Sequence, residues 1–237
     1  MKSLITVTDT VEAEKVIGTG CDIIDIKNPA EGSLGANFPW VIRGIIERVP
    51  DSQKTSVAVG DVPDLPGTVS LAAASAAGLS PDFVKIGLKG TKDSGSAVNL
   101  LKKCRRAVKN VDESVKVVGA TYADYEKFDG ISPSELPEIG ERAGLDLVMV
   151  DTAFKDSGNL FSHMDTGEMK DFVDDAHSRG LGTALAGSLK MEDVKRIGST
   201  GADIFGVRGA VCEEDDRESS LSPEKAESLA EKIGSIY

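Results

Sequence analysis

The sequence predicts an α/β protein folded as a (β/α)8 barrel, on the basis of two observations. Short apolar, β-branched runs alternate with longer helix-like stretches, and eight such pairs can be marked along the chain. This alternation is typical of parallel strands joined by crossover helices. The length of 237 residues suits one TIM barrel, which needs roughly 250. We therefore expect a single domain over residues 1–237, with a doubly wound open sheet as the alternative.

The expected strands are the apolar runs, taken in chain order. They cover residues 4–7, 22–26, 56–59, 83–86, 115–120, 145–150, 182–186 and 203–207. Helices are expected in the intervals between them. The loops of residues 28–39 and 213–220 follow the second and eighth strands, where barrel loops lie over the catalytic face.

Polar residues and glycines mark where several of these helices begin and end. Thr8, Ser134 and Ser222 each stand just before a helical pattern, and Pro223 suits the first helical position. Glycines precede the next strand at several points, where a left-handed C-terminal turn favours them. These are Gly18 or Gly20, Gly78, Gly144, Gly180 and Gly201.

The amino-acid composition argues against some classes of binding partner. A formal charge of −12 and a pI near 4.7 would repel nucleic acid and anionic membrane surfaces, so neither is expected as a partner. A small anionic substrate remains compatible if its pocket is locally basic. No apolar run reaches the length of a signal peptide or a membrane span, and we expect a cytoplasmic protein.

Charged residues stand at the ends of three expected strands, where barrel interiors normally hold valine, isoleucine or leucine. Asp25 and Lys27 are spaced by two residues, so both should point to one face of the second strand. Lys85 should occupy the same level on the fourth strand, and Asp151 closes the sixth. We expect these four side chains to converge at the catalytic end of the barrel.

Two converging lysines indicate amine catalysis. An ordinary lysine, with a pKa near 10.4, is protonated at neutral pH and cannot attack a carbonyl. A second ammonium group and burial both lower such a pKa, while aspartates nearby can transfer protons. The alternative is structural, with Lys27 paired to Asp25 and Lys85 to Asp151. A magnesium site is less favoured, because the lysines would compete with the metal for the carboxylates.

A phosphate site is expected in the loops after the seventh and eighth strands, where barrels commonly present backbone N–H groups. The segments ALAGSL and GVRGAV supply a set of glycines with one hydroxyl and one fixed cation: Gly187, Ser188, Gly206, Arg208 and Gly209. Tight turns would explain the glycines equally well. Arg208 strengthens the phosphate interpretation, because its guanidinium is a permanent donor.

Several longer segments resemble the archaeal (5-formylfuran-3-yl)methyl phosphate synthase family. They are DIIDIKNPAEGSLGANFPWVI, VGDVPDLPGTVSLAAA, DFVKIGL, VDTAFKDSGNLF, ALAGSL and GVRGA, and together they span most of the chain. The resemblance implies a lyase of methanofuran biosynthesis. Such an enzyme condenses two molecules of glyceraldehyde 3-phosphate, with loss of phosphate and water.

The resemblance also implies roles for individual residues. Lys27 would form the Schiff base, Lys85 would accept a proton, and Asp25 and Asp151 would assist as acid and base. Lys155 would bind the phosphate that leaves. We expect no cofactor and no metal. We also expect the protein to form a homo-oligomer. The alternatives are a class I aldolase on the same barrel and a phosphosugar-binding protein without turnover.

Overall fold

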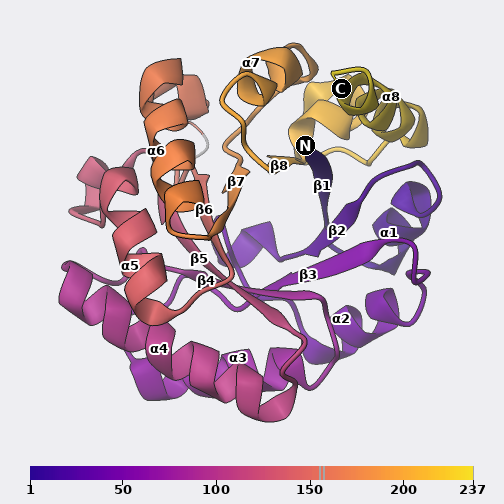
Figure 1. Cartoon of the computed structure of the whole chain (residues 1–237). Coiled ribbons are helices and arrows are strands. Elements are labelled where there is room, and N and C mark those ends of the chain that lie inside the picture. Colours follow the sequence, from indigo (N-terminus) through magenta and orange to yellow (C-terminus); the bar gives the residue numbers. More distant parts are fainter. Residues whose placement is uncertain (155, 157, 237) are drawn as a thin grey trace.

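Eight parallel strands close into a barrel in chain order in the computed structural model, which describes residues 1–154, 156 and 158–236 (Figure 1). The predicted closed barrel is thus confirmed over the open sheet. The strands are β1 (Lys2–Val7), β2 (Ile23–Ile26), β3 (Lys54–Ala58), β4 (Phe83–Gly87), β5 (Lys116–Tyr122), β6 (Leu147–Asp151), β7 (Gly182–Leu185) and β8 (Ile204–Val207).

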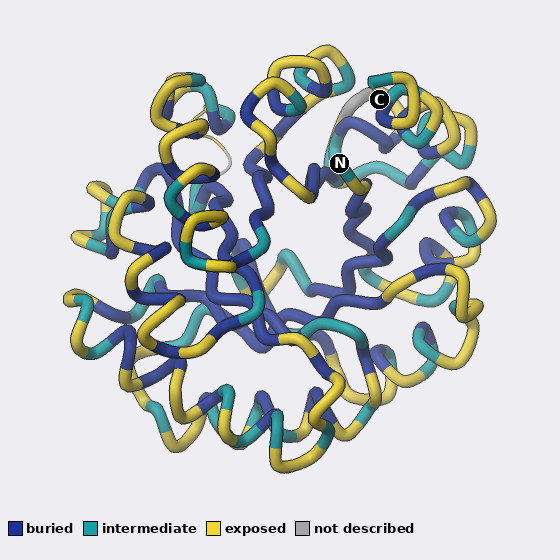
Figure 2. Tube along the Cα trace, viewed as in Figure 1, coloured by how far each residue is buried: buried dark blue, intermediate teal, exposed yellow. Residues whose placement is uncertain are grey.

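The helices form a ring around these strands, and their outer faces carry most of the exposed residues (Figure 2). The two chain ends lie near each other, since β1 pairs with β8. No helix in the described residues is long and apolar enough to cross a membrane. The helices are α1 (Thr10–Val16), α2 (Pro39–Ile46), α3 (Pro66–Ala77), α4 (Ser94–Val111), α5 (Leu136–Ala143), α6 (Thr166–Ser178), α7 (Val194–Gly198) and α8 (Pro223–Gly234).

The barrel interior is filled by layers of four side chains from alternate strands, the usual arrangement in this fold. The lowest layer comes from the even strands and is apolar: Ile23, Phe83, Leu147 and Ile204. The odd strands supply the next: Leu4, Ser56, Val118 and Ala184. The third comes from the even strands again: Asp25, Lys85, Met149 and Gly206. Charge therefore enters the interior at the third layer.

An aspartate just before each even strand sets the register of that strand against the preceding odd one. Asp82, for example, accepts hydrogen bonds from the N–H of Thr55 at 2.8 Å and from its hydroxyl at 3.4 Å. The same position before the other even strands binds the matching N–H of the preceding strand, in the pairs Asp22 with Ser3, Asp146 with Val117 and Asp203 with Thr183. These bonds satisfy N–H groups at the lower edge of the barrel.

The predicted helix starts were partly wrong. Ser222 caps α8 with Pro223 at the first turn, as predicted. Asp9, not Thr8, caps α1, because the Asp9 carboxylate reaches the N–H of Glu12. The fifth helix is preceded by a short 3-10 turn (Pro133–Glu135) that Ser132 caps, so Ser134 lies inside that turn.

Most of the predicted helix-end glycines have the expected positive φ. They are Gly18, Gly20, Gly144, Gly180 and Gly201. Gly78 was predicted wrongly, since it has a right-handed helical φ of −66°. The left-handed residue there is Ser80, two positions further on, with φ 61°.

Candidate active site

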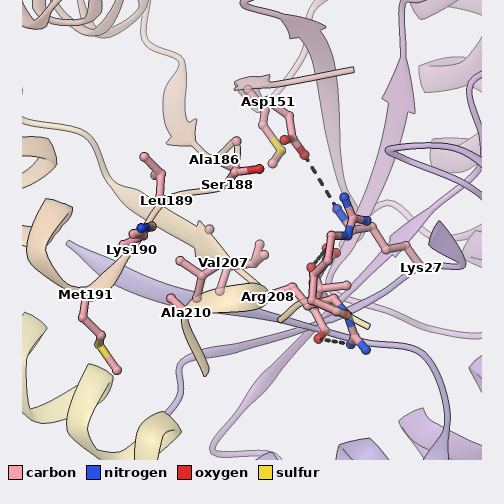
Figure 3. Close-up of a pocket in the computed structure, with 18 of the residues that line it drawn as sticks. Lys27, Asp151, Ala186, Ser188, Leu189, Lys190, Met191, Val207, Arg208 and Ala210 are labelled. Carbon is pink, nitrogen blue, oxygen red and sulfur yellow. Dashed lines mark hydrogen bonds and ion pairs between the residues drawn. The ribbon is translucent and has the colours of Figure 1, made fainter. Parts of the chain in front are cut away.

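A cavity of about 310 Å³ opens at the carboxyl ends of the strands (Figure 3). Its walls come from β1, β2 and β6 and from the loops that follow β7 and β8. This is the end of the barrel that carries the catalytic loops in other enzymes of this fold. Asp25, Lys27 and Asp151 line it, as do Gly187, Ser188, Gly206, Arg208 and Gly209. These predicted residues are thus brought to one cavity, whereas Lys85 lies below it.

Lys27 presents its amine to the cavity from the residue just after β2. Its Nζ lies 3.7 Å from Asp151 Oδ2, which reaches across from the end of β6 (Figure 3). Lys27 is 7% exposed, so a small molecule in the cavity can touch an amine that bulk water barely reaches. The arrangement suits addition of the amine to a carbonyl, with a carboxylate beside it to move protons.

Lys85 lies deeper and does not line the cavity. Its Nζ is 2.6 Å from Asp25 Oδ1, and both side chains are almost completely buried. The angle at this contact does not meet hydrogen-bond geometry, and among the described residues neither atom has a hydrogen-bond partner. Asp25 is therefore the link between Lys85 and the cavity, and its second oxygen accepts a hydrogen bond from Thr6 Oγ1 at 3.1 Å.

The alternative interpretation, in which the two lysines only form structural ion pairs, predicted the wrong partner for each lysine. Lys27 pairs with Asp151 and Lys85 with Asp25, whereas the expected partners were Asp25 and Asp151 respectively. The reason is that Asp25 and Lys27 lie at different heights along the barrel axis. Residues two apart on one strand share a face but differ by about 6.6 Å along it, so Asp25 lies one layer below Lys27, at the level of Lys85.

Burial lowers the pKa of the Lys85 ammonium. The Asp25 charge opposes this effect and the Lys27 charge adds to it, leaving the pKa below that of an ordinary lysine. A lowered pKa makes it easier for a buried lysine to exchange a proton with a neighbouring acid, which suits a group that takes up and returns protons. The two lysines are thus chemically distinct: one faces the cavity, and the other can accept a proton through Asp25.

The loop after β7 places backbone at the opposite wall of the cavity. Gly187 and Ser188 both have positive φ, at 114° and 51°. In the described part of the chain, the N–H groups of Ser188 and Gly209 have no protein hydrogen-bond partner. Unpaired N–H groups beside a cavity are the donors that bind phosphate in many barrels.

Arg208 lines the same wall, but most of its donors are already bound. Its guanidinium grips both oxygens of Glu12 at 2.8 Å, and it also binds the carbonyls of Thr6 and Arg217. These four bonds leave one of its five N–H donors for a ligand. Arg208 therefore contributes positive charge to the cavity while joining β1 and α1 to the loop after β8.

Some residues of the cavity were missed by sequence reasoning. Lys190 and Arg217 line its mouth, but both lie in irregular loops where no spacing rule applies. Glu12 gave no signal, because an acid in the first turn of a helix is common. Among the described residues, the cavity wall holds four cationic and four anionic side chains, so their formal charges cancel although the chain carries −12. The predicted Lys155 lies outside the described residues.

Comparisons with known proteins agree with the resemblance seen in the sequence. The family model described as 4-HFC-P synthase matches residues 3–230. The (5-formylfuran-3-yl)methyl phosphate synthase of Methanocaldococcus jannaschii is 49% identical over 214 residues, covering 90% of this chain and 91% of the relative. The synthase of the same name from Methanosarcina acetivorans is 47% identical and covers 97% of both chains.

Among solved structures, 3-hexulose-6-phosphate synthase from Salmonella typhimurium superposes with a TM-score of 0.68. The alignment covers 100% of both chains, at 17% sequence identity. Such distant similarity supports the barrel fold alone.

Proposed function

Because this chain belongs to the 4-HFC-P synthase family, we propose that it condenses two molecules of glyceraldehyde 3-phosphate into (5-formylfuran-3-yl)methyl phosphate. The product would be the furan precursor of methanofuran. In this proposal Lys27 carries the substrate as a Schiff base, and inorganic phosphate and water are released. The observation that supports it most directly is the amine of Lys27 in the cavity, with Asp151 beside it and Asp25 one layer below.

The first step is attack of the neutral Lys27 amine on the aldehyde carbon of one triose phosphate. A carbinolamine forms, and loss of its hydroxyl as water gives the imine. Asp151, 3.7 Å from the amine, is placed to give and take the protons that this exchange requires. The positive imine then acidifies the C–H bond on the neighbouring carbon.

The second step removes that proton. Asp25 lines the cavity and contacts the deeper Lys85 at 2.6 Å, so the proton passes to the Asp25–Lys85 pair and an enamine is left on Lys27. Elimination of phosphate follows and turns the terminal carbon of this triose into the nucleophilic end of an enol. That carbon adds to the middle carbon of the second triose phosphate, which becomes a carbonyl by an aldose–ketose proton shift. Ring closure and loss of two molecules of water give the aromatic furan, whose stability drives the sequence forward. Hydrolysis of the imine releases the product aldehyde.

Phosphate would be bound by the loops after β7 and β8. Among the residues that the structure describes, the N–H groups of Ser188 and Gly209 have no protein hydrogen-bond partner, and Gly187 and Gly206 have no side chain that would fill the cavity beside them. Arg208 adds a fixed positive charge. Lys155 is proposed as a further phosphate ligand from the family resemblance alone.

Reductive trapping tests the position of the Schiff base. Borohydride added during turnover should reduce the imine and add the mass of a triose derivative to the peptide that carries Lys27. Lys190 is a built-in control, because it is an exposed lysine at the mouth of the same cavity. Label on Lys190, or on no lysine, would contradict the proposal.

A further inference from the structure

The loop between β2 and α2, residues 27–38, folds back over the barrel mouth. Ser33 Oγ donates a hydrogen bond to the carbonyl of Thr152 at 2.9 Å, directly after β6 on the far side of the barrel. Leu34 is completely buried and belongs to the interior cluster of apolar side chains that includes Ala58 and Tyr122. This β2–α2 loop therefore acts as a plug, with Leu34 as its apolar tip.

The plug has a defined internal structure. The N–H of Asn28 binds the carbonyl of Gly35 at 2.9 Å, which closes the neck of the loop. A Cβ atom at Gly35 would lie 2.1 Å from the carbonyl oxygen of Asn28, so this close approach requires glycine. The side-chain amide of Asn37 binds the carbonyls of Thr8 and Lys27, so the loop also holds the backbone of the lysine from which it starts.

One carboxylate fastens the tip of the plug to the barrel. Asp61, in the loop after β3, accepts a hydrogen bond from the N–H of Leu34 at 3.0 Å through Oδ2. Its other oxygen accepts a hydrogen bond from the hydroxyl of Tyr122, which is fully buried on β5. A Cβ at Gly87 would lie 2.3 Å from the Asp61 carboxylate, so β4 leaves room for this acid by having glycine there.

Lys85 lies two residues before Gly87 on the same inward face of β4, one layer below the Asp61 carboxylate. The open cavity lies on the side of β1 and β6–β8 and does not reach Lys85. The plug thus covers the part of the barrel mouth beneath which this amine lies. We propose that Asp61 is a positioning residue of the reaction: it holds the plug closed and so keeps water away from Lys85.

The consequence for chemistry follows from burial. Burial is the largest cause that lowers the pKa of Lys85, so admitting water should raise that pKa. Among the described residues, the charged groups that act most strongly on this amine are Asp25 and Lys27 from β2 and Asp151 from β6. The Asp61 carboxylate lies one layer above it, so a variant of Asp61 also removes a negative charge, and Asp61→Asn measures that effect with the plug still held. This inference rests on the proposed function in one respect, since it assigns Lys85 the role of proton acceptor.

The test compares wild type with Asp61→Ala, Asp61→Asn and Asp64→Ala. Asp61→Ala removes both hydrogen bonds, and amide exchange across residues 28–38 should accelerate at least about tenfold, as expected for the loss of one hydrogen bond to a charged group. Asp61→Asn can still accept from Leu34 and donate to Tyr122, so it should largely preserve protection. Asp64, exposed in the same loop, is the matched control and should change nothing.

The second readout is the protonation of Lys85 itself. Titration of lysines labelled with carbon-13 at Cε, with Lys85 assigned by its loss in Lys85→Arg, should give a higher pKa in Asp61→Ala than in Asp61→Asn, which lacks the same carboxylate charge. The acidic limb of the kcat profile should move to higher pH in the same variant, and the KM for glyceraldehyde 3-phosphate should stay within about twofold, because the phosphate loops are untouched.

Should Asp61→Ala fail to fold, Tyr122→Phe provides the same test, since it removes one anchor of Asp61 without opening a large space. Unchanged exchange in the loop would overturn the inference. So would faster exchange with a Lys85 pKa no higher than that in Asp61→Asn. Both readouts are independent of turnover, so a wild-type protein that makes no furan would contradict the proposed function and leave this test intact.

Discussion

Lys27 and Lys85 are alike in sequence but differ in their surroundings. Lys27 meets the cavity and has a carboxylate 3.7 Å away, whereas Lys85 is enclosed and pressed against Asp25 at 2.6 Å. A nucleophile must reach its substrate, while a proton acceptor needs a low pKa more than exposure. The different burial of the two amines is thus consistent with the roles proposed for them.

Removal of the Lys85 charge should destabilise the protein. Lys85→Met leaves the Asp25 carboxylate buried without its partner, which costs about 3–5 kcal/mol in comparable buried pairs. The double variant Asp25→Asn/Lys85→Met should lose less than the sum of the two single variants, because it leaves no unpaired charge. Urea unfolding at neutral pH measures all four members of the cycle. Strictly additive losses would show that the two side chains do not interact.

Arg208 and Glu12 should make stability depend on pH. Burial alone would raise the pKa of Glu12, but the hydrogen bonds and charge of Arg208, together with two hydrogen bonds from Thr8, outweigh it and lower that pKa. The stabilisation is therefore present above the ordinary glutamate pKa of about 4.3 and is lost as pH falls through the lower value of the folded state. The difference in unfolding free energy between wild type and Arg208→Met should be largest near neutral pH and shrink below about pH 4.

An exposed arginine provides the control for that measurement. Arg48 pairs with Glu14 on the surface, where such pairs contribute about 0.2–1 kcal/mol. Arg48→Met should thus change stability little at any pH. A difference for Arg208→Met that stayed constant down to pH 3 would mean that the Glu12 contact is not what stabilises this end of the barrel.

At the scale of the elements, every even strand is preceded by an aspartate that binds the N–H of the preceding odd strand. Three residues beyond this aspartate lies the third interior layer, which holds Asp25 and Lys85. Five residues beyond it lie Lys27, Asp151 and Arg208. These four basal aspartates, Asp22, Asp82, Asp146 and Asp203, therefore fix the axial level at which the charged side chains of the site lie.

Loss of one basal aspartate should weaken the fold without altering the chemistry. Asp82→Ala leaves the buried N–H of Thr55 without its acceptor, at a cost of about 1–3 kcal/mol. The kcat should remain within about twofold of wild type, since the cavity is at the other end of the barrel. Asp51→Ala, at an exposed turn before the same strand, is the matched control. A large loss of kcat with unchanged stability would contradict this role.

The elements could be predicted from sequence more fully than the contacts between them. Strand positions follow from apolar runs, which are set locally, and all eight were predicted within a few residues. The partners of Lys27 and Lys85 depend on the stagger between strands, which no local pattern specifies. The ion pair between Arg208 and Glu12 joins residues from opposite ends of the chain, and rules based on residue spacing cannot predict such a pair.

At the scale of the whole molecule, closure of the barrel brings residues that are far apart in the sequence into one site. β2, β4 and β6 are never neighbours in the sheet, yet their carboxyl ends deliver two lysines and two aspartates to one place. The charges of the described cavity residues cancel in a chain of charge −12, so this cavity repels an anionic molecule less than the rest of the surface does.

The measurement that tests the central claim most directly follows furan formation and phosphate release together. Purified protein is mixed with glyceraldehyde 3-phosphate alone, and ultraviolet absorbance and free phosphate are recorded at the same time. Both signals should rise in proportion and both should vanish in Lys27→Arg, which keeps the charge but cannot form the imine. Conversion to an aldol without phosphate release would indicate a plain aldolase, and undiminished furan formation in Lys27→Arg would contradict the proposed role of Lys27.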